Sequence, residues 1–362
     1  MFHRRNKSAT ITQPVKLKVH QQEPLNNLVK LLNMKTSHIL LLSTALLIAL
    51  SSCNQNRQNT EPKEEPVTMQ AAPFSSDSAY IFAEKQVAFG PRVPNTPAHG
   101  KCAEYLESTL RRYTRNVIVQ RGTVNAYDGT ALKFSNIIGS FNPEAKVRVL
   151  LLSHWDSRPV ADHDPDPAKR RQPVDAANDG ASGVGILLEV ARQLSIKQPA
   201  IGVDILLVDA EDYGAPEDAA SNATDDWALG SQYWAKNPHK AGYTARFGIL
   251  LDMVGATDAR FTLEGTTMKY APDIARKVWA IGEQLGYGDI FSSQETNAIT
   301  DDHVYINEII RIPTIDIIQY DPTTSSGFYK NWHTTHDNMD GLSKETLQAV
   351  GSTVLTTVYN EK

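Results

Sequence analysis

The sequence predicts an α/β protein, a three-layer α/β/α sandwich around a central mixed, mostly parallel twisted sheet. Three mainly apolar runs, residues 147–153, 203–208 and 247–251, are rich in Val, Ile and Leu. Runs of this kind are typical of strands whose two faces are both covered. Helical segments lie between these runs, and strands that alternate with helices build a sheet with helices on both faces.

The other elements follow from periodicity and from turn residues. Residues 75–89 predict a helix that starts at Ser and Asp and ends before Gly90-Pro91, and residues 181–194 predict an amphipathic helix. The remaining expected elements are a helix over 98–113, strands over 116–124 and 132–141, a helix that includes 231–236, a helix over 271–285, a strand over 314–318 and a helix over 344–359.

Residues 1–52 are expected to lie outside the folded domain. Met34-Lys35 starts a basic region, residues 39–50 form a short apolar run, and residues 50–53 resemble a bacterial lipobox that ends in Cys53. The apolar run is too short to span a bilayer comfortably, which favours a lipoprotein signal peptide over a transmembrane helix. Met34 is then the expected start and residues 1–33 a mis-called extension. The alternative is a cytoplasmic extension before an anchor helix.

Acylation of Cys53 would make it the mature N-terminus. Residues 53–73 are polar and rich in Gln, Asn, Glu and Pro, so we expect a flexible tether. Residues 74–362 are long enough to bury one large core and show no obvious linker, which predicts a single domain. A lipid anchor would place this domain in the cell envelope, facing the periplasm or the cell surface.

The amino-acid composition limits the kinds of partner that the protein can bind. Residues 53–362 contain 29 Lys and Arg against 40 Asp and Glu, a formal charge of −11, which argues against nucleic-acid binding. The sequence has two cysteines, so acylation of Cys53 would leave Cys102 without a partner for an intramolecular disulfide. We expect a monomer.

Polar residues with metal-ligand chemistry cluster near the predicted strand ends. They are His154 and Asp156, Asp179 before a helix, Glu211 and Asp212, Asp252, and His333 in a late loop. Open α/β sheets place their ligand crevice at the carboxyl ends of the strands, so these side chains are expected to meet there. Zinc binds His nitrogen and Asp or Glu oxygen and keeps one position open in catalytic sites.

Each of these residues also has a structural alternative. Asp179 could simply cap the following helix, and His154 could be a hydrogen-bonded structural residue. Glu211 and Asp212 could form an exposed acidic turn, although adjacent carboxylates directly after a buried strand favour a nearby cation.

The histidines of the late loop and of other loops can also be either site residues or structural residues. Either His333 or His336 could pack without a catalytic role, and Trp332 beside His333 favours His333 as the site residue. His163 and His239 lie in polar, proline-containing loops, which predicts that they face the solvent.

The ordered motifs resemble the M28 zinc aminopeptidase superfamily and, within it, the glutaminyl cyclases, most closely the bacterial envelope members. The resemblance runs from about residue 75 to the C-terminus. The matching segments are residues 90–97 (GPRVPNTP), 153–159, 178–183 (NDGASG), 251–256 and Trp332-His333.

This resemblance implies specific roles. One zinc ion would be held by Asp179, Asp212 and His333, with Glu211 as general acid and base. Asp252 and Asp301 would form a short hydrogen-bonded network. Asp316 occupies the position of a His in animal cyclases, so the protonation of that network does not transfer.

The reaction implied is conversion of N-terminal glutamine to pyroglutamate with release of ammonia, on peptides and exported proteins. Trp332 would form an apolar wall for the substrate. Trp227 is a weaker candidate for the same wall, with ordinary packing as its alternative.

Two other functions stay open at this stage. In the di-zinc aminopeptidases of the superfamily, His154 and Asp252 bind a second zinc and Asp179 bridges the two metals. His154, Asp156 and Asp316 are therefore either neighbours that support the ligands or residues of a second metal site. A non-catalytic envelope lipoprotein that uses the fold for binding is the third possibility.

Overall fold

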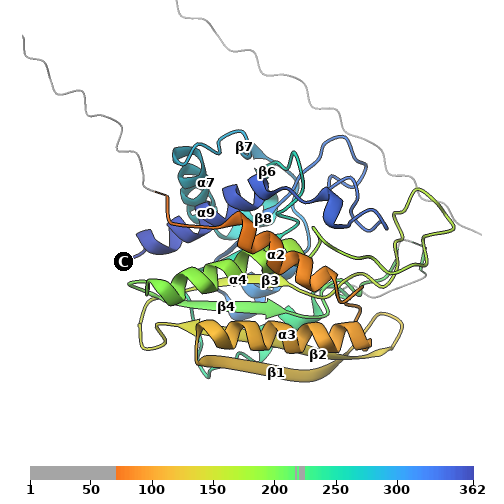
Figure 1. Cartoon of the computed structure of the whole chain (residues 1–362), viewed down its shortest axis with the longest axis horizontal. Helices are drawn as coiled ribbons and strands as arrows, with labels where there is room; N and C mark the ends of the chain where they lie inside the picture. Colours follow the sequence, from red (N-terminus) through yellow and green to blue (C-terminus); the bar gives the residue numbers. More distant parts are fainter. Residues whose placement is uncertain (1–70, 217, 220–224) are drawn as a thin grey trace, which may run out of the picture. The chain divides into compact units, whose positions relative to one another are not determined.

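A six-stranded mixed sheet forms the centre of the described domain (Figure 1). The computed structural model describes residues 71–216, 218–219 and 225–362. The spatial strand order is β1-β2-β4-β3-β5-β8. These strands are β1 (Asn116–Asn125), β2 (Ala131–Phe141), β4 (Gly202–Val208), β3 (Arg148–His154), β5 (Phe247–Asp252) and β8 (Thr314–Ile318). Strands β4, β3, β5 and β8 are parallel, and β2 is antiparallel to both neighbours. The predicted α/β fold is confirmed.

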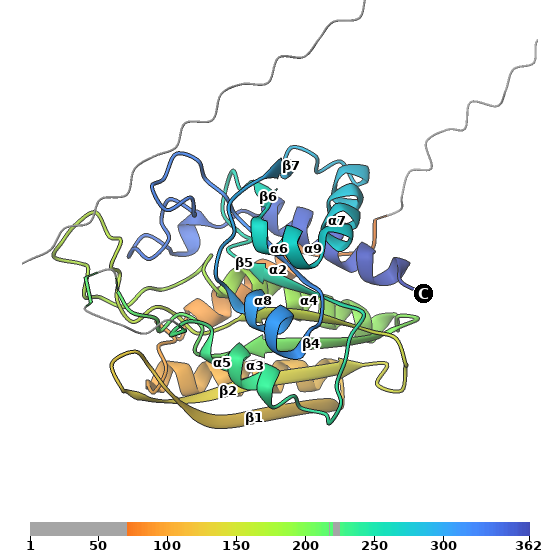
Figure 2. The same ribbon diagram turned by 180° about the vertical axis from the view of Figure 1, so that it is seen from behind.

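Helices cover both faces of the sheet. Helices α2 (Ser76–Val87), α3 (Pro97–Tyr113), α4 (Ala181–Ile196) and α9 (Lys344–Asn360) lie on the face towards the viewer in Figure 1. Helices α5 (Leu229–Lys236) and α8 (Asp302–Tyr305) lie on the opposite face, seen in Figure 2. This arrangement gives the three layers expected from the alternation of strands and helices.

The apolar strands divide the core between the two faces. On β3, Leu151 faces the α2, α3, α4 and α9 layer, whereas Leu150 and Leu152 pack with Trp234 and Ile306 on the other side. Successive side chains of a strand point to opposite faces of the sheet. A continuous apolar run therefore places apolar side chains in the core on both faces. Each fully buried Leu or Ile contributes about 1.5–3 kcal/mol relative to exposure.

Several short elements were not expected from the sequence. They are β6 (Phe261–Leu263) and β7 (Phe291–Glu295), which pair in a second sheet, α6 (Gly265–Tyr270), α8, the π-helix η1 (Ile306–Ile310) and the 3₁₀ turn η2 (Met339–Gly341). Helix α7 (Pro272–Gln284) was expected within one residue at each end. Elements of three to six residues are shorter than the window in which periodicity can be recognised.

The predicted signal peptide, Cys53 and nearly all of the tether lie outside the described residues, so they stay predictions. Cys102 is buried, and burial raises the pKa of its thiol to about 12. Within the described ranges, no helix is both long and apolar enough to cross a membrane.

Candidate active site

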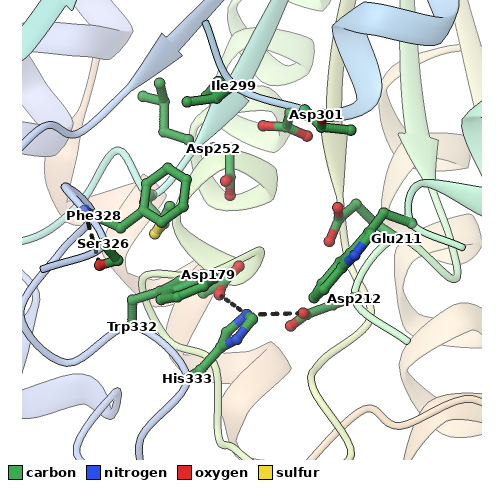
Figure 3. A pocket seen from close by; sticks show the side chains of 14 residues that line it. Asp179, Glu211, Asp212, Asp252, Ile299, Asp301, Ser326, Phe328, Trp332 and His333 are labelled. Carbon is green, nitrogen blue, oxygen red and sulfur yellow. Dashed lines mark hydrogen bonds and ion pairs between the residues drawn. The ribbon is translucent and has the colours of Figure 1, made fainter. Parts of the chain in front are cut away.

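A cavity of about 360 Å³ opens at the carboxyl ends of the parallel strands (Figure 3). His154 and Asp252 are the last residues of β3 and β5, and Glu211 and Asp212 follow β4. The cavity is lined by Asp179, Glu211, Asp212, Trp227, Asp252, Met253, Ile299, Thr300, Asp301, Ile318, Ser326, Phe328, Trp332 and His333. The sheet edge therefore gathers side chains that are far apart in the chain.

Asp179, Asp212 and His333 form a buried cluster of possible metal ligands on one side of the cavity. His333 Nε2 lies 3.1 Å from Asp212 Oδ1 and 3.7 Å from Asp179 Oδ2. Asp179 Oδ2 and both carboxylate oxygens of Asp212 are buried without a hydrogen-bond partner. Buried oxygens are normally paired, so the unsatisfied lone pairs fit a bound cation. Two carboxylates and one imidazole match a catalytic zinc site with an open position.

Burial and neighbouring charges shift the pKa values of Asp179 and Asp212 in opposite directions. Burial opposes ionisation of Asp179, but contacts with His154 and His333 lower its pKa overall. Burial raises the pKa of Asp212, and the nearby Asp179 carboxylate adds to this effect. A cation between the two carboxylates would favour the ionised form of both.

Two further aspartates fix the ligand loops through backbone hydrogen bonds. Asp156 accepts from the N–H groups of Glu211 (3.1 Å) and Asp212 (3.2 Å). Asp337 accepts from the N–H groups of Asn178 (2.9 Å) and Asp179 (3.0 Å). The carboxylates of Asp156 and Asp337 thus hold the backbones that carry Asp212 and Asp179.

Arg158 and Asp162 support His333, the third possible ligand. Asp162 Oδ1 lies 3.5 Å from Nδ1 of His333, on the side of the ring away from the cavity. Arg158 donates to both oxygens of Asp162, at 3.0 and 2.7 Å, and to the carbonyl of Asp212 at 3.1 Å. Its guanidinium lies 4.6 Å from the ring centre of Trp227. Arg158 thus connects the ligand cluster with an aromatic wall.

A second group of possible ligands shares Asp179. His154 Nε2 lies 3.0 Å from Asp179 Oδ1 and 3.2 Å from Asp252 Oδ1. Asp179 is followed by Gly180, whose φ is +100° and whose missing Cβ would lie 2.9 Å from the His154 ring. The helix that follows has no side-chain cap, so Asp179 does not act as the capping residue considered above.

Glu211 and three aromatic side chains complete the cavity. Burial raises the pKa of the Glu211 carboxyl well above its usual value, and the charges of Asp212 and Asp301 add to the shift. Trp332 stacks on His333 at 3.7 Å, and Trp227 lies nearly parallel to the same ring at 5.9 Å. Phe328 packs against Trp332 at 4.8 Å. The cavity therefore combines apolar walls with ionisable groups.

Acids crowd the opposite side of the cavity. Burial is the main cause that raises the pKa of Asp252 to about 6 and of Asp301 to about 7. Behind them, the carboxyl groups of Asp302 and Asp316 are completely buried. Burial, with nearby Asp301, raises the pKa of Asp302 to about 8 and that of Asp316 well above its ordinary value.

The structure places most predicted site residues around one cavity. Asp179, Glu211, Asp212, Trp227, Asp252, Asp301, Trp332 and His333 line it. His154, Asp156 and Asp316 lie directly behind its wall and contact other residues of the site. His336, the alternative to His333, is exposed.

Two histidine predictions are wrong. His163 is half-buried and packs on Trp332 with a centroid distance of 4.4 Å. His239 is half-buried between Trp234 and Tyr243 and accepts a hydrogen bond from Trp234 Nε1. Both loops fold back onto aromatic side chains, which their polar local sequence does not reveal.

Sequence reasoning assigned no role to five supporting residues: Arg158, Asp162, Glu264, His303 and Asp337. Two of them lie close to segments singled out from the sequence: Arg158 lies within residues 153–159, and Asp337 follows His333 by four residues.

Comparison with known proteins agrees with this geometry. Residues 136–358 match the model of peptidase family M28. A solved glutaminyl cyclase from Tannerella forsythia is 55% identical and covers 80% of this chain and 100% of its own, with a TM-score of 0.79. A solved Zn-dependent exopeptidase from Parabacteroides distasonis is 53% identical over 81% of this chain and 100% of its own, with a TM-score of 0.80.

A curated animal relative extends the comparison. The glutaminyl-peptide cyclotransferase of Bos taurus is 24% identical over 86% of this chain and 92% of its own length. The chain belongs to peptidase family M28 and, within that family, to the group of the glutaminyl cyclases.

Proposed function

We propose that this protein is a zinc-dependent glutaminyl-peptide cyclotransferase that converts the N-terminal glutamine of peptides and proteins to pyroglutamate and releases ammonia. The observation that carries the proposal is the arrangement of the cavity. A three-ligand cluster faces Glu211, Asp252 and Asp301 across a space of about 360 Å³ with tryptophan walls. The 55% identity to a glutaminyl cyclase along its full length supports the same function.

Asp179, Asp212 and His333 would hold one zinc ion per chain. Their unpaired buried oxygens and their residue types fit this metal. The chemistry that bound zinc supplies is Lewis-acid polarisation of the glutamine γ-carbonyl, with stabilisation of the negative charge that develops on its oxygen.

The side chains of this protein perform the proton transfers. Glu211 takes a proton from the attacking α-amine and delivers it to the departing amide nitrogen, which leaves as ammonia. Its raised pKa suits this role because a general acid and base works best when its pKa lies near the operating pH. Asp252 and Asp301 bind and orient the amine, while Trp332 and Trp227 pack against the aliphatic part of the glutamine side chain.

A di-zinc aminopeptidase is the second candidate, and one observation favours it. His154, Asp179 and Asp252 converge as a second group of possible ligands, and Asp179 belongs to both groups. Such an enzyme would activate water and shorten the peptide. In the cyclase, His154 instead hydrogen-bonds Asp179 and Asp252 and thereby holds both carboxylates in place.

We also propose that the protein is a monomeric lipoprotein of the cell envelope, acylated at Cys53, and that exported proteins with N-terminal glutamine are among its substrates. The lipobox-like residues 50–53 and the polar stretch after them support this location. Metabolic labelling with a fatty acid tests it. The full chain should be labelled and fractionate with membranes, whereas the Cys53→Ser variant should remain unlabelled.

The test of the reaction is incubation of the purified, untagged mature protein with a short glutamine-starting peptide. We expect ammonia release and a mass decrease of one ammonia with no loss of residues. Release of free amino acids would select the aminopeptidase. Neither product from protein with bound zinc would indicate a non-catalytic binding protein.

A further inference from the structure

A second cavity of about 200 Å³ lies beside the catalytic cavity. Ile299, Ile318, Ser326 and Phe328 line both cavities and form the wall between them. Asp301 lines only the first of the two, and Glu264 lines only the second. The two carboxylates therefore mark opposite sides of this wall.

A row of closely spaced, buried ionisable groups lies between these two carboxylates. Possible ligand atoms of Asp301, His303 and Asp316 all lie within 4.8 Å of one another. His303 Nδ1 lies 3.7 Å from Asp316 Oδ2, and His303 Nε2 lies 3.0 Å from Glu264 Oε1. All four side chains are at most 5% exposed, and His303 and Asp316 are completely buried.

The hydrogen bonds define the direction of this row. Glu264 also accepts from the backbone N–H groups of Thr266 and Thr267 at the start of α6, so it is an acceptor for His303 Nε2. The other ring nitrogen, Nδ1, therefore faces Asp316. His303 Nδ1, both oxygens of Asp316 and Asp301 Oδ2 have no hydrogen-bond partner in the structure. Unpaired buried polar atoms are rare, and protons shared along the row would satisfy them.

We infer that Asp301, Asp316, His303 and Glu264 form a proton path from the catalytic cavity to the second cavity, with His303 and Glu264 as its outer half. This inference rests on the proposed function. A substrate α-amino group has a pKa of about 7.7–8.0, so it arrives mainly as ammonium and must lose a proton before it can attack. In the proposed reaction the N-terminal residue enters the catalytic cavity first, so the rest of the peptide would lie between its amine and the bulk water.

The proton balance is complete. The substrate ammonium gives one proton to Asp301, Asp301 gives one to Asp316, and Asp316 gives one to His303 Nδ1. His303 releases its Nε2 proton to Glu264, which passes it to water or buffer in the second cavity. The second amine proton moves through Glu211 to the amide nitrogen. The released ammonia then takes up a proton in solution, so the net reaction neither gains nor loses one.

The acidities of the two ends of the row suit uptake of a proton from an amine and its release to water. Burial raises the pKa of Asp301 to about 7, close to that of an α-amine. Despite burial, hydrogen bonding and the charge of His303 lower the pKa of Glu264, so this end releases its proton readily. The Asp301 carboxyl also interacts electrostatically with Asp252 on β5 and with His154 on β3. It interacts in the same way with Asp302, which precedes His303 in the chain.

Two variants test the path. Glu264→Gln keeps an oxygen that can cap α6 but cannot carry the proton, and His303→Asn removes the imidazole. Thr296→Val, which changes another polar residue of the second cavity, is the matched control. Steady-state ammonia release is measured for all proteins across a pH series, in H₂O and D₂O, with and without added imidazole. Zinc content and Tm are measured in parallel.

For both path variants we expect kcat to fall at least about tenfold with KM and zinc content unchanged. The solvent isotope effect should increase. Imidazole, a small base offered to the second cavity, should restore much of the rate at concentrations that do not inhibit the unmodified protein. The control should behave like the unmodified protein. If only one path variant folds, its rate and its response to imidazole decide the question.

Three results would overturn the inference. Path variants could keep the rate and isotope effect of the control. Their loss could resist imidazole and accompany a lower Tm or lower zinc content, which indicates a structural role. Metal analysis could find an ion lost together with His303, which would make the row a cation site. Failure of the unmodified protein to release ammonia would instead refute the proposed function.

Discussion

Two acidic clusters face each other across the cavity, and they differ in how their negative charge is neutralised. The metal-facing cluster, Asp179, Asp212 and His333, is held by Asp156, Asp337 and Asp162 and leaves several oxygens unpaired. The inner cluster, defined as Asp301, Asp302, His303 and Asp316, consists of buried acids with raised pKa values around one imidazole.

The difference shows that the same residue type serves two purposes in one site. Carboxylates that are fixed through backbone N–H groups and converge with an imidazole can bind a permanent cation. Carboxyl groups that are buried together cannot all ionise, so some of them keep protons. We therefore propose that one side of the cavity binds metal and that the other transfers protons.

The largest loss of activity is expected when a proposed ligand is removed from the metal-facing cluster. His333→Ala leaves two carboxylates without their imidazole, so zinc content should fall and ammonia release should drop at least about 10³-fold. Metal analysis and the ammonia assay check both outcomes. His336→Ala is the control, because this histidine is exposed three residues away. Full activity of the His333 variant would remove this residue from the metal site.

Glu211→Gln should leave the metal in place and stop the proton transfer. We expect kcat to fall about 10²–10⁴-fold, the usual contribution of general acid and base catalysis. The measurement is steady-state kinetics on zinc-loaded protein, with the exposed Glu104→Gln as control. A variant that loses zinc to the same extent as His333→Ala would show that Glu211 is a ligand rather than the acid and base.

Asp162→Asn sharpens the comparison of the two clusters. The carboxylate facing His333 Nδ1 orients the ring, and loss of such a partner typically costs about 10–100-fold in metal affinity. Competition with a chromogenic chelator measures this change. Asp302→Asn, an equal change in the inner cluster, should leave zinc affinity unchanged. Equal losses for both variants would mean that the clusters are not functionally separate.

The smallest expected effect is on stability. Burial and Asp301 raise the pKa of Asp302 from 3.8 to about 8 in the native state. Between these pH values the native state binds more protons than the unfolded state, so this group lowers stability as pH rises. Asp302→Asn removes the effect. The Tm of Asp302→Asn minus the Tm of the unmodified protein should therefore be a few degrees larger at pH 8 than at pH 5. An equal difference at both pH values would refute the assigned pKa.

The sequence predicted the features that long apolar runs and strand ends determine. The buried runs located β3, β4 and β5. The rule that ligands gather at the carboxyl ends of strands predicted that Asp179, Asp212 and Asp252 lie close together. The features it missed depend on contacts between distant residues. Glu264 and His303 are 39 positions apart. His303 ends the segment Asp301-Asp302-His303, but nothing in that segment indicates that the histidine pairs with Glu264.

Local polarity also misled the prediction for His163. Its loop is rich in Asp and Pro, yet it folds over the cavity rim and places the ring on Trp332. Tertiary packing decided this position, as it did for the short elements β6, β7 and α6. Sequence patterns indicate which faces are apolar but not which surface loop returns to the site.

Stepwise addition of zinc to the metal-free protein, followed by ammonia release from a glutamine-starting peptide, tests the central claim most directly. We predict that the rate reaches its maximum at one equivalent of zinc per chain while the peptide keeps all its residues. A maximum that requires two equivalents, together with a shortened peptide, would contradict the single-zinc cyclase.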